Sequence, residues 1–242
     1  MATRQKTNLP VNCQQQLLAE AENIAARVSA PTGDRIRMTK TGFVLPDGTE
    51  TDTINAVIVE FVSTNSLFET VYDPNNPQPP GCFAVGFEPN SLKPVAASPN
   101  KQCDSCTECP MNVFGTATTG RGKACKNSRL LALMSADAAE NDSPLWTYSV
   151  PPTGLPYFDR YVNTLASKHR TVPVGVVTEI TLEDCGTYLS PRFRIVRPLS
   201  PKELAPYMES REEAKQRLFA EPDFSQYTPA KRAPAKRATA RR

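Results

Sequence analysis

Cysteines are concentrated in a segment whose sequence predicts neither a helix nor a strand. Residues 88–128 lack the apolar periodicity of a helix or strand, yet they hold four of the seven cysteines: Cys103, Cys106, Cys109 and Cys125. A structureless stretch of this length inside a domain needs something to hold it. The overlapping C-x-x-C turns direct thiolates at one point, and zinc accepts four sulfur ligands at about 2.3 Å. The spacing therefore predicts one structural zinc ion, whose binding folds the loop.

The identity of the four ligands is open between two sets. One set consists of the four loop cysteines, and the other replaces Cys103 with Cys82, which starts the strand-like run CFAVGF. A ligand at a strand end ties the loop to a sheet, whereas three thiolates at three-residue spacing rarely converge on one ion. We therefore favour Cys82, Cys106, Cys109 and Cys125. Free thiols, disulfides and an iron–sulfur cluster are the competing interpretations, and the isolated Cys13 and Cys185 are interpreted as packing residues.

Composition and missing motifs narrow the function. Apolar residues make up 39% of the chain, and no apolar run approaches the 18 residues of a membrane span. The N-terminus lacks the apolar region of a signal peptide, so we expect an intracellular protein that is not secreted. The only histidine is His169, and no G-x-S-x-G, H-E-x-x-H or Walker A motif is present. We therefore expect no enzyme activity, and four available thiolates favour a closed zinc site over a catalytic one.

The pattern of the remaining chain predicts a mainly β fold of the α+β class. Apolar spacing predicts helices at 10–29, 154–169 and 201–221, the last opened by a Ser200–Glu203 capping box. Strand-like runs fall at 35–45, 54–63, 82–87, 130–134, 145–150, 174–182 and 193–196. Because strands and helices do not alternate, a doubly wound sheet is excluded. The order fits a small, partly open β-barrel with one helix inside the strand order and helices flanking it.

A basic segment follows the cysteine loop. Between Gly120 and Leu130 it places four positive charges beside two glycines: Arg121, Lys123, Lys126 and Arg129. Such donors beside open backbone N–H groups suit phosphate binding. Neighbouring aromatic residues are candidates for stacking unpaired bases: Phe114, Trp146, Tyr148 and Tyr157. The competing interpretation is a solvated loop beside core aromatics.

The charge distribution separates a tail from a body. The last fourteen residues carry six positive charges and no acid, which leaves 22 basic and 25 acidic residues, or −3, for the rest. We expect an N-terminal arm at 1–9, one domain at 10–222 with the zinc loop at about 88–128, and a disordered basic tail at 223–242.

Several runs resemble a family of proteins from tailed phages that are regarded as single-stranded DNA-binding proteins. The resemblance covers about residues 10–220 and rests on PPGCFAVGFEP at 79–89, CTECPMNVFG at 106–115, GRGKACKNSRL at 120–130 and PVGVVTEI at 173–180. It implies an OB-like, partly open barrel with a four-cysteine zinc insertion, whose ligands map onto Cys82, Cys106, Cys109 and Cys125. The extra Cys103 departs from that pattern, and so does the basic tail, since many replication-type single-strand binders end in an acidic tail that recruits partners.

The resemblance implies a function in the cytoplasm of an infected bacterium. The first expectation is a protein that coats single-stranded DNA during phage DNA replication, recombination or repair, with phage replication proteins as partners. The second is a transcription cofactor that holds promoter DNA single-stranded for a viral RNA polymerase. The third is a zinc-stabilised structural or inhibitory protein that binds a host protein and no nucleic acid.

Overall fold

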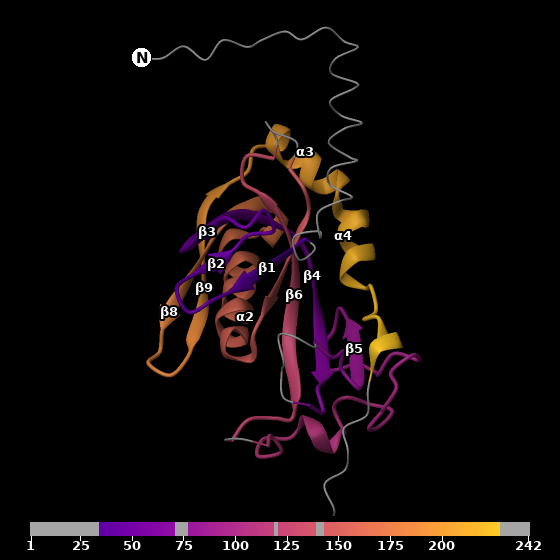
Figure 1. Ribbon diagram of the computed structural model, residues 1–242. Helices are drawn as coiled ribbons and strands as arrows, with labels where there is room; N and C mark the ends of the chain where they lie inside the picture. The colour runs from indigo at the N-terminus through magenta and orange to yellow at the C-terminus, as the bar shows by residue number, and fades with distance from the viewer. Residues whose placement is uncertain (1–33, 71–76, 119–120, 139–142, 228–242) are drawn as a thin grey trace, which may run out of the picture.

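One curled, mixed sheet organises the chain (Figure 1). The computed structural model describes residues 34–70, 77–118, 121–138 and 143–227, so the helix predicted at 10–29 lies outside the described residues. The nine strands run in the order β3-β2-β1-β7-β6-β4-β8-β9, with β5 paired to β4. Since the end strands β3 and β9 are not neighbours, the sheet is a half-barrel and not a closed barrel. The mainly β, α+β prediction is confirmed at this level.

The strands range from short edge pieces to two long central strands. Among the strands that the structure describes, only β1 and β7 pair in parallel. Their bounds are β1 Arg35–Met38, β2 Phe43–Val44, β3 Glu50–Thr51, β4 Thr53–Leu67, β5 Cys82–Gly86, β6 Cys125–Ser135, β7 Trp146–Val150, β8 Val176–Asp184 and β9 Leu189–Pro198. The predicted strands are all present, and the strand predicted at 130–134 starts earlier, at Cys125. Strands β4 and β6 pair along most of their length, which gives the sheet its long axis.

Apolar side chains are buried on both faces of the sheet. On β6, Leu131 and Leu133 point to an inner core, while Ala132 and Met134 point to an outer one. This two-residue alternation is what a strand covered on both sides requires. Helix α2 (Leu155–Thr164) lies inside the curl on the inner face, where Phe158 is fully buried (Figure 1).

Two helices cover part of the outer face. They are α3 (Pro201–Glu209) and α4 (Arg211–Leu218), where a single helix at 201–221 was predicted. The capping box is confirmed, since the Ser200 side chain accepts from the amide of Glu203 and the Glu203 carboxylate accepts from that of Ser200. Pro206 removes one helical hydrogen bond, and the helix ends one turn later at Ser210.

Short turns complete the described chain. The helix predicted to reach His169 is α-helical to Thr164 and continues as a π-helical turn, η3 (Leu165–His169). Residues 223–227, assigned by sequence to the disordered tail, include the 3-10 turn η5 (Phe224–Gln226), and Tyr227 donates to Glu69. These five residues therefore contact the domain through Tyr227, and 228–242 lie outside the described residues. None of the described helices is long and apolar enough to cross a membrane.

Candidate metal centre and nucleic-acid interface

The sheet brings two of the predicted zinc ligands to the same end of the molecule. In the register, Leu67 at the end of β4 pairs with Cys82 on β5 on one side and with Cys125 on β6 on the other. Paired residues in neighbouring strands point to the same face. Cys82 and Cys125 therefore lie on one face, two strands apart, below which the cysteine loop packs.

The loop cysteines meet these two residues around one small cavity. Its volume is about 10 Å³, room for one water molecule or one ion, and five thiols line it: Cys82, Cys103, Cys106, Cys109 and Cys125. Four of them are no more than 9% exposed, whereas Cys103 is half-buried. The donor set is all sulfur, which suits zinc. In the described part of the chain, however, no three Cys, His, Asp or Glu side chains stand together as metal ligands. The thiols thus have the right chemistry for a metal and lie around one cavity, but their side chains are not arranged as metal ligands.

The surroundings favour the protonated form of Cys82, Cys106 and Cys125, whose thiol pKa values are raised. Burial, with a smaller contribution from the neighbouring thiols, raises the pKa of Cys125 to about 12. Burial likewise raises the pKa of Cys82 and of Cys106. Cys103 differs in its partner, since its thiol donates to the Ser105 carbonyl at 2.8 Å. A buried thiol becomes a ligand only when a cation compensates the loss of its proton.

Hydrogen bonds connect the cysteine turns to the basic segment. The Asn112 amide donates to the Cys106 carbonyl at 2.7 Å, and the Lys123 ammonium donates to the Asn112 side-chain oxygen at 3.1 Å. The Gly115 amide donates to the Gly122 carbonyl at 3.0 Å. Whatever orders the cysteine turns therefore also orders Lys123 and its neighbours.

The four predicted phosphate-binding residues do not form one cluster. Arg121 and Lys126 are exposed, and Lys123 is half-buried. Arg129 is ion-paired with Asp159 of α2 at 3.2 Å, with its side chain only 12% exposed. Lys126 and Arg129 are three residues apart on β6, so strand alternation sends them to opposite faces. The structure thus keeps Arg121, Lys123 and Lys126 together and separates Arg129 from them.

Among the predicted stacking aromatics, only Phe114 is exposed, while Tyr157 is half-buried. Its side chain is 77% exposed, and the Lys123 ammonium lies 5.2 Å from the ring centroid. Trp146 is half-buried and packs against the inner core. Tyr148 is 1% exposed and meets Phe43 edge to face at 5.7 Å. Tyr148 has no open face for a base, because alternate residues of β7 fill the curl.

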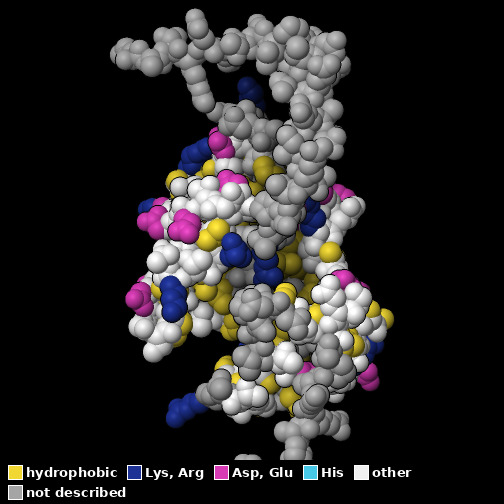
Figure 2. Space-filling view, viewed as in Figure 1, with side chains coloured by type: hydrophobic (Ala, Val, Ile, Leu, Met, Phe, Trp, Pro, Cys, Tyr) yellow, Lys and Arg dark blue, Asp and Glu magenta, His cyan; other side chains and the backbone are white. Residues whose placement is uncertain are grey.

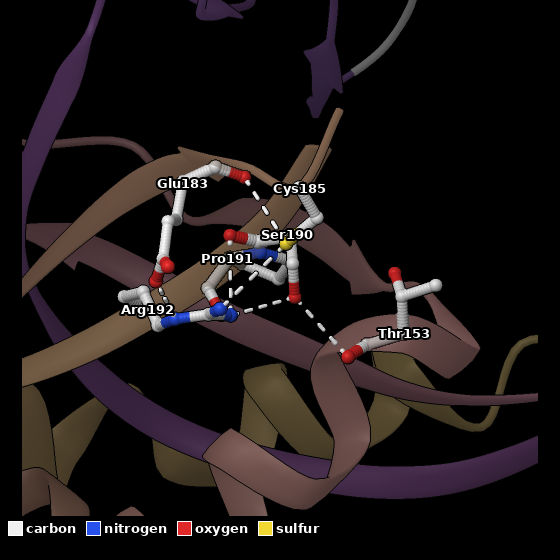
Figure 3. A network of polar contacts seen from close by, with 6 residues as sticks. All are labelled: Thr153, Glu183, Cys185, Ser190, Pro191 and Arg192. Atoms are coloured by element: carbon white, nitrogen blue, oxygen red, sulfur yellow. Dashed lines mark hydrogen bonds and ion pairs between the residues drawn. The ribbon is translucent and has the colours of Figure 1, made fainter. Parts of the chain in front are cut away.

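Arginines on β9 are neutralised by carboxylates. Arg192 bonds Glu183 at 2.5 Å and Ser190 at 2.7 Å (Figure 3), and it stacks 3.4 Å from the Tyr157 ring centroid. Arg194 bonds Glu179 through two nitrogens, at 2.8 and 2.9 Å. Figure 2 shows the same mixture of basic and acidic side chains around β8 and β9. In contrast, Arg121, Lys123 and Lys126 form no ion pair within the described residues. Sequence reasoning missed the Arg192–Tyr157 stack, for which only the alternating charges of the two strands gave a signal.

Comparisons of the chain with models of protein families, with curated proteins and with solved structures found no match.

Proposed function

We propose that this chain binds single-stranded DNA without catalysing a reaction. The binding element is the loop that carries Phe114, Arg121 and Lys123, which we name the Phe114 loop. The observation that carries the proposal is the exposed Phe114 ring with Lys123 over it, flanked by Arg121 and Lys126. An accessible aromatic face stacks any base, and cations without carboxylate partners bind the adjacent phosphates. Duplex DNA offers no unstacked base, so the same surface prefers single strands.

The fold supports this proposal. A curled half-barrel with a helix inserted in the strand order resembles a partly open OB-like barrel. OB-like domains bind oligonucleotides. We propose the OB-like description on that ground. Phage DNA replication, recombination or repair is the proposed setting, through the sequence resemblance.

A structural zinc ion completes the proposal. Burial favours Cys82, Cys106, Cys109 and Cys125 as ligands, because the half-buried Cys103 already donates to Ser105. Rotation of the buried thiols toward their shared cavity would give the ion four sulfur ligands. The ion would act on DNA binding through the bonds that run from Cys106 through Asn112 to Lys123.

Fluorescence anisotropy with labelled single-stranded and duplex oligonucleotides tests the proposal. The wild-type protein should bind the single strand more tightly, and Phe114→Ala should weaken that binding by about 1–3 kcal/mol, the usual value of one stacked base. Tyr188→Ala is the matched control, because Tyr188 is an aromatic residue that is 50% exposed on a different loop, the β8–β9 turn. Absence of single-strand binding at low salt, or equal loss in both variants, would contradict the proposal.

The basic tail provides an independent arm of the same experiment. Its six charges attract any polyanion but carry no aromatic residue, so they cannot distinguish strandedness. Deleting residues 229–242 should weaken binding to single strands and duplexes alike and flatten the salt dependence. If the deletion alone abolishes the single-strand preference, the described domain is not the binding domain.

A further inference from the structure

The outer face of β6 continues the uncompensated positive charge of the Phe114 loop. On β6, Cys125 lines the thiol cavity and Arg129 bonds α2, so the odd-numbered residues face inward. Lys126 and Ser128 therefore face outward. Lys126 is exposed, and its ammonium donates to the Lys123 carbonyl at 3.2 Å. The outer face of β6 thus begins directly beside the loop.

The two neighbouring strands extend this outer face with polar and basic side chains. Tyr148 and Val150 of β7 lie in the inner core, so Ser149 between them faces outward, opposite Leu130 of β6. On β1, Ile36 lies in the inner core, and Arg35 and Arg37 on either side of it are exposed. The parallel register of β1 and β7 places Arg35 beside Thr147, which puts Arg37 beside Ser149.

We group these outward-facing residues under one name, the outer strip: Lys126, Ser128, Ser149, Arg37 and Arg35. None of its three cations forms an ion pair within the described residues, unlike the arginines of β9. The hydroxyls of Ser128 and Ser149 likewise make no hydrogen bond there. Arg and Lys side chains without carboxylate partners, and Ser hydroxyls, commonly bind backbone phosphates.

The dimensions of the outer strip suit a strand, not a single phosphate. Strand rise of about 3.3 Å per residue and strand spacing of about 4.8 Å place the backbones of Lys126 and Arg37 roughly 16 Å apart. At the Leu145 end of β7, α4 limits the strip, since Arg217 bonds the Leu145 carbonyl just before that strand. The path therefore has one open direction, from the Phe114 loop across β6 and β7 to β1.

We propose that single-stranded DNA leaves the Phe114 loop and runs along the outer strip, with its phosphates on Lys126, the two serines and the β1 arginines. This inference rests on the proposed function and assigns the path of the bound strand. It places the DNA on the face opposite to α2 and Arg129. The loop supplies base stacking, and the outer strip supplies sequence-independent phosphate contacts.

The test compares charge-matched variants on the full-length protein with a fluorescein-labelled twenty-nucleotide oligothymidylate. Arg35→Ala/Arg37→Ala should reduce affinity at low salt and lower the log–log salt slope by up to about 1.4, at about 0.7 for each single-strand phosphate that the variant no longer binds. Arg194→Ala/Arg197→Ala removes two β9 arginines that are ion-paired, and it should leave the slope unchanged. Ser149→Asp, which places a carboxylate within the strip, should weaken binding more than Ser149→Ala.

Each outcome separates this inference from the proposed function. If Phe114→Ala weakens binding while the β1 double variant and Ser149→Asp do not, the strip is wrong and the proposed function stands. If none of these variants weakens binding, both fail. If the β9 pair lowers the salt slope as much as the β1 pair, the strip has no special role and the inference is overturned. Thermal melts of each variant identify any loss of folding, and a misfolded double variant leaves Ser149→Asp as the deciding measurement.

Discussion

The two ends of the sheet are held together in different ways. At one end, β4 and β6 are covered by α2 on the inner face and by α3 and α4 on the outer face, with a large apolar core on each side. At the other end, the same two strands meet a cluster of only Ala84, Leu92 and Cys106, beside the thiol cavity. The strands are shared, so the difference lies in what covers them. Apolar burial stabilises the first end, and the second end has thiols where a core would be.

Removing the metal should have the largest effect, confined to the cysteine end. Protein purified without added metal should contain about one zinc per chain, and Cys109→Ser or Cys125→Ser should make residues 88–124 protease-sensitive. The effect should be large because structural zinc contributes an apparent binding free energy of about 10–16 kcal/mol in peptides. Elemental analysis and limited proteolysis are the measurements.

The controls for this prediction also decide the ligand set. Cys185→Ser should change neither metal content nor proteolysis, because Cys185 is exposed at the β8–β9 turn and does not line the thiol cavity. Cys82→Ser should release zinc, and Cys103→Ser should not. Zinc content near zero, or an iron chromophore, would refute the metal centre and leave the order of the loop to its hydrogen bonds.

A core substitution should have the next largest effect and act on the other end. Phe158 is fully buried and meets Phe61 and Phe193 edge to face, with ring centroids 5.1 and 5.2 Å apart. Phe158→Ala should lower the free energy of unfolding by about 3–5 kcal/mol, through lost burial and the cavity left behind. Urea denaturation measures this loss. Zinc content should be retained under native conditions, and its loss would show that the two ends are not independent.

The surface Phe87 gives the matched control for that variant. Its ring is 52% exposed and meets Phe219 at 5.0 Å. Phe87→Ala should cost much less than Phe158→Ala, because most of its surface is already in water. Equal losses would mean that the inner core does not carry the stability of this end.

Local patterns were enough to predict the strands and the capped helix, whereas long-range pairings were not. Val and Ile alternation indicated most of β4, and Ser200 with Glu203 indicated the start of α3. The partner of Arg129 could not be predicted, since Asp159 lies 30 residues away on a helix whose position depends on the closed curl. Counting charges between 120 and 130 suggested a single cluster, whereas strand alternation divides it.

The same difference between local patterns and long-range pairings applies to the candidate site. Spacing alone placed Cys106 and Cys109 in one turn, and the register then brought Cys82 and Cys125 beside them. The aromatic residues of β7 were ambiguous in the sequence, because a buried strand and a base-binding strand use the same residue types. Only the position of α2 inside the curl settles that Tyr148 is core.

A smaller effect is expected where the two ends join. β8 pairs with β4 up to Ala56 and β5 pairs with it from Ser63, and Glu60 lies between them next to a bulge. Its carboxylate is 12% exposed and bonds Arg211 of α4 at 2.6 Å. Arg211→Ala should destabilise the protein by about 1–3 kcal/mol, because it leaves a nearly buried carboxylate without its cation.

A double variant distinguishes this mechanism from simple loss of packing. Glu60→Gln/Arg211→Met removes both charges and should recover most of the stability lost in Arg211→Ala, as measured by urea denaturation. The Arg211 Nε is buried without an acceptor within the described residues, so its removal has little cost of its own. No recovery in the double variant would show that the ion pair is not what joins the ends.

The smallest effect should be a change in the free energy of unfolding at acid pH. We expect it only at the end of the sheet that α2, α3 and α4 cover. The Arg197 side chain, followed by the amide and hydroxyl of Ser200, lowers the pKa of Glu203 to about 2. A carboxyl whose pKa is lower in the folded state contributes stability above its unfolded value, near 4.5, and loses it as the pH falls toward 2. Glu203→Gln should therefore flatten the decline in unfolding free energy between pH 4.5 and 2, with little change in the pH range over which zinc is released. Glu209→Gln, an exposed change on the same helix, should leave the decline as in the wild type. If Glu203→Gln instead shifts the pH range over which zinc is released, the protein responds to acid as one cooperative unit. The two ends of the sheet are then not stabilised separately.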